Sequence, residues 1–429
     1  MAASSSTRSP AAKARWLIFV LACSASFITY VHRYSWGVIR PSLKAEYGFD
    51  DAQMGWMDSA FNLTYALGQY PGGLGGDIFG PRIIIYLAII LWSIVMIGPA
   101  LVRGYWKLIG VRLLFGATQA PCYPNLGKTT INWFPASIRT TVQGMVASTA
   151  GRAGAAMAPI LIGTLLMGYW KMSWQQSLFV LAGFGFMYAA FFWMLFRNRP
   201  AEHPFSNEAE RELIEAGEVT NLAADEIKLN WTRATKINFG IFLAASFCST
   251  FADNLFVFYM PQYLKEEKGF SDAAMGIFAS LPLWGGAIGG LCGGILNDLC
   301  IRWTGSRKNG RRIVAAGGKL IATCFIAASF LFQDGRLIMG AFFFAKFFSD
   351  WSQPTWWGTV TDLGGPAAGR VFGMANLAGS IGGTVAGPIM GYVKLYGGWG
   401  ALFVGVGIMY VLTAFCWMKV DCTKRLVGD

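Results

Sequence analysis

The chain is poor in charged residues and has almost no histidine. Only 14% of its 429 residues are Asp, Glu, Lys or Arg, and two are His, whereas a soluble domain has about 25% charged residues. Its eight cysteines are scattered, with no CxxC pair and no cluster of Cys with His, so the sequence indicates neither a zinc site nor a disulfide framework. It also contains no paired nucleophile and base and no nucleotide-binding loop. We therefore expect no enzyme, no metal and no cofactor.

Apolar residues and glycine make up most of the rest. Apolar residues account for 54% of the chain, 53 residues are Gly, and Lys and Arg outnumber Asp and Glu by 35 to 23, which gives a net charge of +12. A basic excess is typical of nucleic-acid-binding proteins, but such proteins do not carry this much apolar surface. We therefore expect no nucleic-acid partner and a different role for the positive charge.

Long uncharged runs predict membrane-spanning helices. Residues 83–102, 172–196 and 397–418 contain no charged residue, and each run reaches the roughly 20 residues needed to cross a bilayer. Other runs keep this length with one or two charges. The pattern predicts an all-α integral membrane protein with twelve transmembrane helices, at residues 16–39, 54–76, 83–102, 106–127, 140–168, 173–196, 237–261, 274–297, 313–333, 337–359, 370–393 and 398–418.

A polar segment at residues 197–236 separates two sets of six predicted helices. It contains six Lys or Arg and eight Asp or Glu and no spanning run, so we interpret it as a linker with a short surface helix around Glu208, Arg211, Glu212 and Glu215. The predicted domains are therefore a tail at 1–15, a six-helix bundle at 16–196, the linker at 197–236, a second six-helix bundle at 237–418 and a tail at 419–429.

The distribution of Lys and Arg predicts the orientation in the membrane. Most of those outside the predicted helices lie in the two tails, the linker and the loops on the same side. Because Lys and Arg concentrate on the cytoplasmic side, we expect a multi-pass protein of the plasma (inner) membrane with both termini in the cytoplasm. Residues 1–15 are rich in Ser and Ala, but the apolar run after them is too long for a signal peptide, so we interpret them as a tail.

The two sets of helices are internal repeats. Gly48-Phe-Asp-Asp-Ala-Gln-Met-Gly55 recurs as Gly269-Phe-Ser-Asp-Ala-Ala-Met-Gly276, and the dipeptide ending at Pro159 resembles the one ending at Pro388. Six helices in each half place the repeats in the same orientation, related by an axis along the membrane normal. Such repeats build transporters whose site lies at the midplane between the halves.

Several motifs resemble those of the major facilitator superfamily. Pro71-Gly-Gly-Leu-Gly-Gly-Asp77-Ile-Phe-Gly80-Pro-Arg82 resembles the signature of its loop between helices 2 and 3. Tyr30-Val-His-Arg33, Gln119-Ala-Pro-Cys-Tyr-Pro124 and Trp133-Phe-Pro135 are similar to its anion:cation symporter branch. That branch includes bacterial hexuronate, galactonate and glucarate carriers and vesicular glutamate and sialic acid carriers. The resemblance implies a major facilitator fold with two pseudo-symmetric six-helix halves.

The resemblance also implies roles for particular residues. It places Tyr30, Arg33, Tyr65 and Arg112 at substrate-binding positions. It further implies that the loop after helix 2, and its repeat after helix 8, latch the halves together. We therefore expect gating roles for Asp77, Arg82 and Asp298. The family's usual basic residue after the Asp is replaced by Ile78, which predicts a weaker latch.

Ionisable residues within the predicted spans are functional candidates, because burying a charge in a membrane is costly. Deep within the spans lie Arg33, Arg112, Arg152, Lys346, Asp253, Asp350 and His32. Arg33 and Arg112 each offer a planar fork that matches a carboxylate. Two alternatives remain open: Arg152 faces a cavity or pairs with Asp253 or Asp350, and Lys346 pairs with Asp350 at i,i+4. We expect Asp58 and Lys319, nearer helix ends, to snorkel to the surface.

Further polar and aromatic positions complete the predicted site. Trp356 suits the C–H face of a polyol, and Asn376 suits a hydroxyl or carboxylate. Gln119 is predicted to bind substrate and stands where proton-coupled relatives have a Glu, so it cannot carry a proton. For ion coupling this leaves His32, which titrates near neutral pH, together with Asp253 and Asp350.

The sequence favours a secondary transporter for a small organic anion, with a hexuronate or another sugar acid as the preferred substrate. We expect coupling to H⁺ or Na⁺ and alternating access of the rocker-switch type. Two alternatives remain: an organophosphate:phosphate exchanger, and a membrane sensor of an organic anion that transports nothing. We expect a monomer whose partners are the substrate, the coupling ion and the lipid bilayer.

Overall fold

The computed structural model describes residues 12–215 and 231–426, and all regular structure in these ranges is helical. Parts of the predicted tails and linker therefore lie outside the described residues. The first half, which we call the N bundle, contains α1 (Ala14–Tyr47), α2 (Asp51–Phe79), α3 (Pro81–Met96), α4 (Gly98–Leu101), α5 (Tyr105–Gln119), α6 (Cys122–Trp133), α7 (Ala136–Gly144), the π-helical segment η1 (Met145–Ala150), α8 (Gly151–Pro159), the π-helical segment η2 (Ile160–Tyr169) and α9 (Trp174–Leu195).

The second half, the C bundle, follows a short 3₁₀ turn η3 (Pro200–Glu202) and the linker helix α10 (Glu208–Glu215), which the charge pattern predicted. It contains α11 (Arg233–Asn254), the π-helical segment η4 (Leu255–Tyr259), α12 (Met260–Glu266), α13 (Asp272–Thr304), α14 (Arg307–Ala328), the 3₁₀ turn η5 (Ser329–Leu331), α15 (Gly335–Ser349), α16 (Ser352–Gly364), the 3₁₀ turn η6 (Gly365–Ala367) and α17 (Ala368–Lys419).

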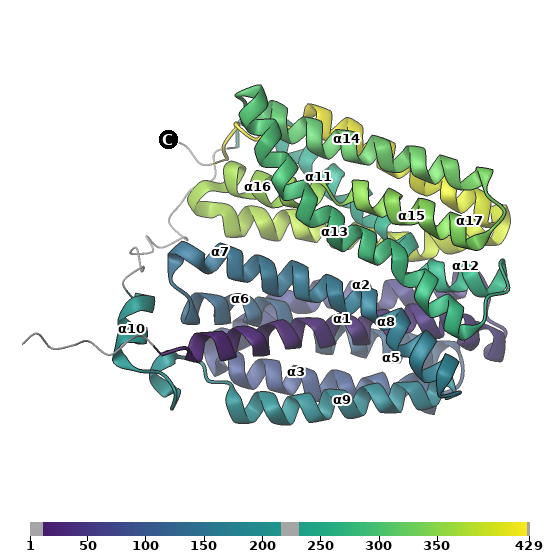
Figure 1. Ribbon diagram of the computed structural model, residues 1–429, viewed down its shortest axis with the longest axis horizontal. Helices are drawn as coiled ribbons and strands as arrows, with labels where there is room; N and C mark the ends of the chain where they lie inside the picture. The colour runs from purple at the N-terminus through teal and green to yellow at the C-terminus, as the bar shows by residue number, and fades with distance from the viewer. Residues whose placement is uncertain (1–11, 216–230, 427–429) are drawn as a thin grey trace, which may run out of the picture.

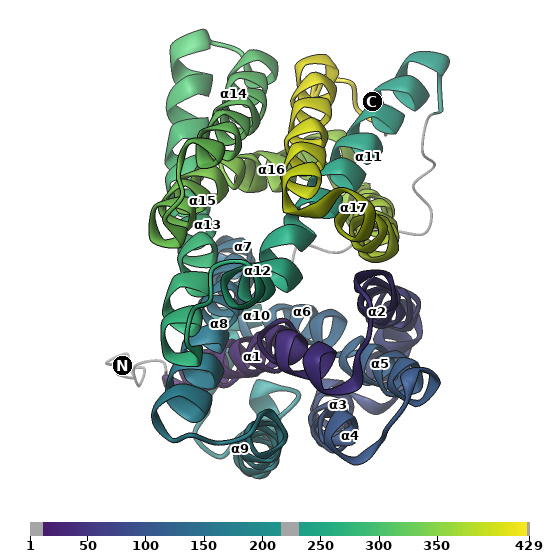
Figure 2. The ribbon, with the colours of Figure 1, turned by 90° about the vertical axis from the view of Figure 1, so that its right-hand side faces the viewer.

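Joined across their short breaks, the helices of the two bundles form twelve rods in the described ranges, six in each bundle. The long helix α17 supplies two of them, because Gly398 within it has a non-helical backbone, with φ 69° and ψ −170°, and divides it at a sharp turn. Figures 1 and 2 show the N bundle and the C bundle packed side by side. The predicted all-α membrane fold with two six-helix halves is confirmed.

Capping signals rather than loss of hydrophobicity fix several helix ends. We predicted that the first helix ends at residue 39, but α1 continues to Tyr47 and stops at Gly48, whose φ of 68° is left-handed. Asp50 and Gln53 then form a capping box that starts α2. Such a box satisfies the free N–H groups of the first helical turn. The helices therefore extend past the apolar runs into the polar surface.

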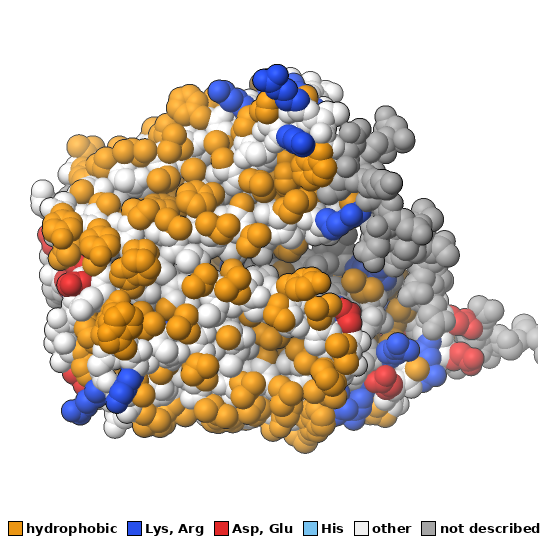
Figure 3. Space-filling model, turned by 180° about the vertical axis from the view of Figure 1, so that it is seen from behind, with side chains coloured by type: hydrophobic (Ala, Val, Ile, Leu, Met, Phe, Trp, Pro, Cys, Tyr) orange, Lys and Arg blue, Asp and Glu red, His pale blue; other side chains and the backbone are white. Residues whose placement is uncertain are grey.

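Eight helical stretches among the described residues are long and apolar enough to cross a membrane, and one of them, α17, comprises two of the twelve rods. The rods below this threshold are α2, the pair α5 and α6, and the pair α15 and α16. Figure 3 shows apolar side chains covering one flank of the molecule, with few charges among them. A lipid-facing belt of this kind is required of a multi-pass protein.

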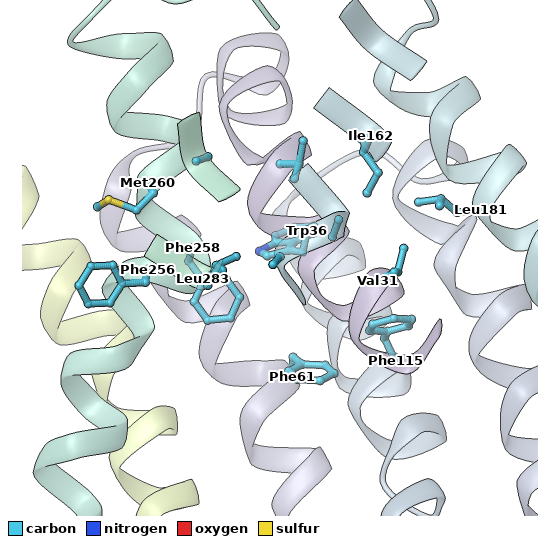
Figure 4. Close-up of a cluster of buried hydrophobic side chains, with 14 of the residues drawn as sticks. Val31, Trp36, Phe61, Phe115, Ile162, Leu181, Phe256, Phe258, Met260 and Leu283 are labelled. Carbon is cyan, nitrogen blue, oxygen red and sulfur yellow. The ribbon is translucent and has the colours of Figure 1, made fainter. Parts of the chain in front are cut away.

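The molecule has two distinct ends. Figure 1 shows α10 and the described end of the chain together at one end, which we call the terminal face. The opposite end, which we call the loop face, carries the turns at Gly48, Gly104 and Gly398. On the side toward the loop face, the bundles share one hydrophobic core. Figure 4 shows Trp36 and Phe61 of the N bundle in this core with Phe256 and Phe258 of the C bundle.

Glycines of the internal repeat bring the bundles into backbone contact near the loop face. A Cβ at Gly55 on α2 would lie 2.2 Å from the carbonyl oxygen of Gly387 on α17. Its repeat partner Gly276 on α13 would place a Cβ 2.4 Å from the carbonyl oxygen of Pro159 on α8. Small residues allow helices to approach this closely. The repeat that the sequence shows therefore marks the two contacts that close this side.

A polar network reinforces the closure at the loop face. Lys394 Nζ of the C bundle lies 2.8 Å from Asp51 Oδ1 of the N bundle and 2.8 Å from Glu266 Oε2. Lys44 of the N bundle bridges the same two carboxylates, at 2.8 Å and 3.3 Å. Gln262 donates hydrogen bonds of 2.8 Å to both. Helices of the two bundles are thus held by one set of charges.

We predict that Gly55→Ala destabilises this closed state. The added Cβ meets backbone rather than a flexible side chain, and overpacking of this kind costs about 1–3 kcal/mol. Thermal unfolding of the detergent-purified protein should show a lower melting temperature. Gly110→Ala on α5 is the matched control, because a Cβ there meets nothing within 4 Å and alanine favours the helix. Equal melting temperatures for the two variants would contradict the closure at Gly55.

Candidate functional site

A cavity of about 700 Å³ lies between the two bundles. Both bundles line it, and it is within the 300–1,000 Å³ typical of small-molecule sites. The structure places seven of the sequence-predicted residues on its wall: Tyr30, Arg33, Tyr65, Arg152, Asp253, Trp356 and Asn376. The predicted residues that do not line it are His32, Arg112, Gln119 and Asp350, together with Asp77, Arg82 and Asp298 of the gating set.

The cavity reaches toward the terminal face. Its wall includes Lys128 and Ile131 on α6, Phe372 at the start of α17 and Trp417 near the end of α17, all of which lie in the terminal thirds of their rods. The loop face is closed by the glycine contacts and the polar network described above. The structure therefore has one closed side and a site that extends toward the other.

Arg33 occupies the wall of the cavity from α1 and is held by aromatic rings. Its guanidinium carbon lies 4.1 Å from the ring centre of Tyr65, 5.1 Å from that of Tyr30 and 5.2 Å from that of Phe61. Its Nε donates a 3.2 Å hydrogen bond to Gln119 Oε1. Cation–π contacts of this kind hold a guanidinium without neutralising its charge.

The hydrogen-bonding capacity of Arg33 is incompletely used. Its Nη2 is buried and donates no hydrogen bond, and among the described residues no carboxylate lies within ion-pair distance of the guanidinium. Leaving a buried donor without a partner is costly. The side chain therefore brings an uncompensated positive charge to the cavity wall, which suits an anion that enters the cavity.

Gln119 supports Arg33 from behind the wall. It is fully buried, accepts the hydrogen bond from Arg33, and donates a 3.1 Å hydrogen bond to the carbonyl oxygen of Thr29. Its oxygen is thereby fixed toward Arg33 and its nitrogen toward α1. In this arrangement Gln119 orients the guanidinium rather than facing the cavity.

A chain of alternating charges connects the two bundles beside the cavity. Arg152, from α8 of the N bundle, forms an ion pair with Asp350. Lys346 Nζ lies 2.7 Å from Asp350 Oδ1 and 2.9 Å from Asp253 Oδ1, and Tyr410 donates a 2.9 Å hydrogen bond to Asp253. Both pairings that the sequence left open, Arg152 with Asp350 and Lys346 with Asp350, are present.

Two expectations about buried charges are wrong. Lys319 does not snorkel: it is 0% exposed and donates hydrogen bonds of 2.8 Å to Ser249 and 2.7 Å to Ser349. Asp58 is also 0% exposed. Each side chain is buried in its bundle because polar groups on neighbouring helices form hydrogen bonds or an ion pair with it. The position of a residue along its own helix does not reveal such partners.

Asp58 belongs to a cluster whose cation the sequence analysis missed. Asp58 accepts a 2.6 Å hydrogen bond from Trp36 Nε1 and lies 3.5 Å from Arg40 Nη2. Arg40 crosses to the C bundle, where it donates to the Phe258 carbonyl oxygen at 3.3 Å and lies over the Tyr259 ring at 4.1 Å. A first helix that continues to its cap at Gly48 places Arg40 inside a membrane span, where an ionisable residue is a functional candidate.

Arg112 and His32 lie together on the far side of α1 from the cavity. Arg112 is buried, donates from Nε to the Met57 carbonyl oxygen at 3.2 Å and lies 4.4 Å from the Trp36 ring. His32 Nδ1 accepts a 3.1 Å hydrogen bond from Trp92 Nε1, so this nitrogen carries no proton. Both border a separate pocket of about 20 Å³, which is large enough for a single water.

Aromatic and amide groups complete the cavity wall. Trp356 on α16 lines the cavity and donates from Nε1 to Ser246 at 2.7 Å. Asn376 on α17 donates to Gln69 Oε1 on α2 at 3.3 Å, so it also bridges the bundles. Such groups suit a ligand with hydroxyls and C–H faces.

The predicted gating residues make contacts within their own bundles. Asp77 lies 2.5 Å from Lys128, and Lys128 lines the cavity. Arg82 stacks at 4.2 Å on the ring of Trp193. Asp298 is exposed and accepts a 3.4 Å hydrogen bond from Asn297. Within residues 12–215 and 231–426, none of these contacts joins the two bundles.

Comparisons with known proteins agree with this architecture. The sequence model of the Major Facilitator Superfamily matches residues 21–387 and 242–425. A probable galactarate/D-glucarate transporter of Bacillus subtilis (strain 168) is 28% identical over 386 residues, covering 86% of this chain and 83% of that protein. A hexuronate transporter of the same organism is 26% identical and covers 83% of each chain.

Solved structures share the fold at low sequence identity. A crystal structure of a bacterial homologue of the human lysosomal transporter Spinster, in an inward-facing and occupied conformation, superposes with a TM-score of 0.74 at 16% identity. The match covers 96% of this chain and 98% of that one. At this identity the likeness concerns the fold.

We predict that Asp58→Ala strongly destabilises the protein. It leaves the buried Arg40 without its carboxylate, and breaking a buried pair in this way costs about 3–5 kcal/mol. Lys265→Ala is the control, since its pair with Asp272 is partly exposed and such pairs contribute at most about 1 kcal/mol. Thermal unfolding in detergent distinguishes them; an Asp58 variant as stable as the control would contradict a structural role for the cluster.

Proposed function

We propose that this chain, which belongs to the Major Facilitator Superfamily, carries a small sugar acid across the membrane. It is a multi-pass membrane transporter and not an enzyme. The observation that carries the proposal is Arg33, a half-buried cation on the cavity wall with no carboxylate at ion-pair distance among the described residues. The names of its relatives, for galactarate, D-glucarate and hexuronate transport, support a sugar acid as substrate.

The substrate's two chemical parts match two regions of the wall. A carboxylate accepts hydrogen bonds from the Arg33 guanidinium, with Tyr30 and Tyr65 stacked around it. The hydroxylated carbon chain then extends toward Trp356 and Asn376, whose ring and amide suit C–H faces and hydroxyls. Arg152 also lies on the wall but is paired with Asp350. Arg112 lies behind the wall and adds positive charge without contacting the substrate.

Transport follows from alternating closure of the two ends. We propose that the bundles at 16–196 and 237–418 rock against one another, linked through 197–236. In the described state the loop face is closed, so substrate exchanges at the terminal face. Closing that face requires Asp77, Arg82 and Asp298 to exchange their present contacts for contacts between bundles. The positive-inside rule assigns the terminal face, with both tails, to the cytoplasm of an inner membrane.

For ion coupling we propose Asp253 as the site of H⁺ or Na⁺. It lines the cavity, its carboxylate is partly exposed, and it contacts Lys346 and Tyr410. Binding a cation there changes the charge chain that runs to Asp350 and Arg152. His32 is a weaker candidate, because it is buried behind α1 and its Nδ1 accepts from Trp92.

Two further functions are distinguished by net flux. An organophosphate:phosphate exchanger moves substrate only against a counter-substrate, and phosphate esters would compete with its uptake. A sensor binds the anion without any flux. Uptake of labelled sugar acids into proteoliposomes with an empty lumen, under separately imposed pH and sodium gradients, excludes both alternatives when it is positive.

We predict that Arg33→Ala lowers sugar-acid uptake about 100-fold or more, because truncating a buried charged partner costs several kcal/mol. Arg33→Lys keeps the charge but loses the planar fork, so it should retain intermediate uptake. Arg103→Ala, at an exposed loop arginine, is the control with parental uptake. Parental uptake by Arg33→Ala in proteoliposomes would exclude Arg33 as the anion site.

We predict that Asp253→Asn abolishes the response of uptake to an imposed ion gradient but preserves exchange of internal for external substrate. Lys346 keeps Asp350 as a partner in this variant, and Asp350 is then shared between Lys346 and Arg152. His32→Asn should retain gradient-driven uptake with an unchanged pH profile. A His32 variant that loses the response, with Asp253→Asn unaffected, would move the coupling role to His32.

A further inference from the structure

Resting on the proposed function, we infer that the cavity binds sugar acids with one carboxylate in preference to the dicarboxylates of the same carbon chain, and that Asp350 sets this preference. Among the described residues, four charged side chains line the cavity: Arg33, Lys128, Arg152 and Asp253. Their partners decide how many anionic groups the site accepts.

Three of the four are already neutralised by protein groups. Lys128 pairs with Asp77 at 2.5 Å, and Asp253 pairs with Lys346 at 2.9 Å. Arg152 pairs with Asp350 and also donates a 2.9 Å hydrogen bond to the Gly286 carbonyl oxygen. Arg33 is the remaining one, with no carboxylate at ion-pair distance in the described part of the chain. The wall therefore offers one cation whose charge no carboxylate of the described chain offsets, which favours one substrate carboxylate.

The pairing of Arg152 cannot be released cheaply. The Arg152 side chain is 24% exposed, but that of Asp350 is 2% exposed, so the carboxylate lies behind the guanidinium, away from the cavity. Lys346 holds the same carboxylate from the other side at 2.7 Å. Both contacts of Arg152 use Nη1, so a substrate carboxylate could reach the rest of the guanidinium, but Asp350 already offsets its charge. A carboxylate there would gain less than one at the unpaired Arg33, and one that displaced Asp350 would leave it buried with half of its compensation.

The rest of the wall offers neutral donors. A ligand anchored at Arg33 meets Asn376, Gln353 and Trp356 on the opposite bundle, and these groups satisfy hydroxyls. A second carboxylate placed there loses its hydration without gaining a cation, which is costly. Lys319 and Arg112 are buried outside the wall; their field favours anions in general but supplies no contact.

Asp350 acts here through Arg152 and is thus a positioning residue. Replacing Asp350 with Asn would free Arg152 as a second fork, and it would leave Lys346 paired with Asp253. The change should therefore add one carboxylate site without adding any atom to the cavity wall.

The test compares D-gluconate with D-glucarate, which differ only at one terminal carbon, a hydroxymethyl in the first and a carboxylate in the second. Uptake into proteoliposomes gives kcat/KM for each. We expect the parent protein to favour gluconate by about tenfold or more, since one uncompensated carboxylate separates the two acids. In Asp350→Asn the ratio should shift about tenfold toward glucarate. The double variant Asp350→Asn, Arg152→Gln should return it toward gluconate.

The inference is overturned if the parent protein has a kcat/KM for glucarate that equals or exceeds its kcat/KM for gluconate. It is also overturned by an Asp350→Asn variant that slows both acids by the same factor, because a purely structural role would do that. Should the single variant Asp350→Asn fail to insert into the membrane, two measurements still test the inference. These are the gluconate-to-glucarate ratio of the parent protein and that of the double variant, which loses both buried charges together. If the protein takes up no sugar acid at all, neither these two nor any other, that result would contradict the proposed function itself.

Discussion

Contact between backbones, not between side chains, fixes the relative placement of the two bundles. At Gly55 and Gly276 the helices approach so closely that a single methyl group would overlap a carbonyl oxygen of the other bundle. Everything on the loop side depends on this approach. The shared core around Trp36 and Phe256, the reach of Arg40 to Phe258 and the network of Lys394 with Asp51 all require the bundles at this spacing.

The same constraint explains where the cavity is. The bundles are held together near the loop face, so the unfilled space lies at mid-depth and toward the terminal face. Burying a charged side chain away from water is energetically unfavourable. The protein offsets this by pairing most charged side chains of the cavity wall with side chains of opposite charge. Arg33 is the exception among the wall's charged residues in the described chain. A site built mostly from neutralised charges with one free cation selects its ligand by charge as well as by shape.

Much of this could be predicted from the sequence. The apolar runs located the helices, the repeat indicated two equivalent six-helix halves, and the i,i+4 spacing of Lys346 and Asp350 indicated their pair. The sequence could not show which way neighbouring residues face. His32 and Arg33 are adjacent, so they point about 100° apart on a helix, and only the packing of α1 shows that Arg33 meets the cavity. Arg40 was not predicted because the apolar run that defined the first helix stops at residue 39. The helix itself ends later, where Gly48 caps α1.

The two closing contacts also bear on how such a chain arises. In the repeat, Gly55 corresponds to Gly276, and the dipeptide ending at Pro388 corresponds to the one ending at Pro159. Each glycine meets the dipeptide of the other half. This is an isologous interface, in which one surface is its own complement about a two-fold axis. An ancestral six-helix chain with a single copy of each element would therefore have formed both contacts at once by dimerising with itself, and gene duplication would have needed only the linker to make that pairing permanent.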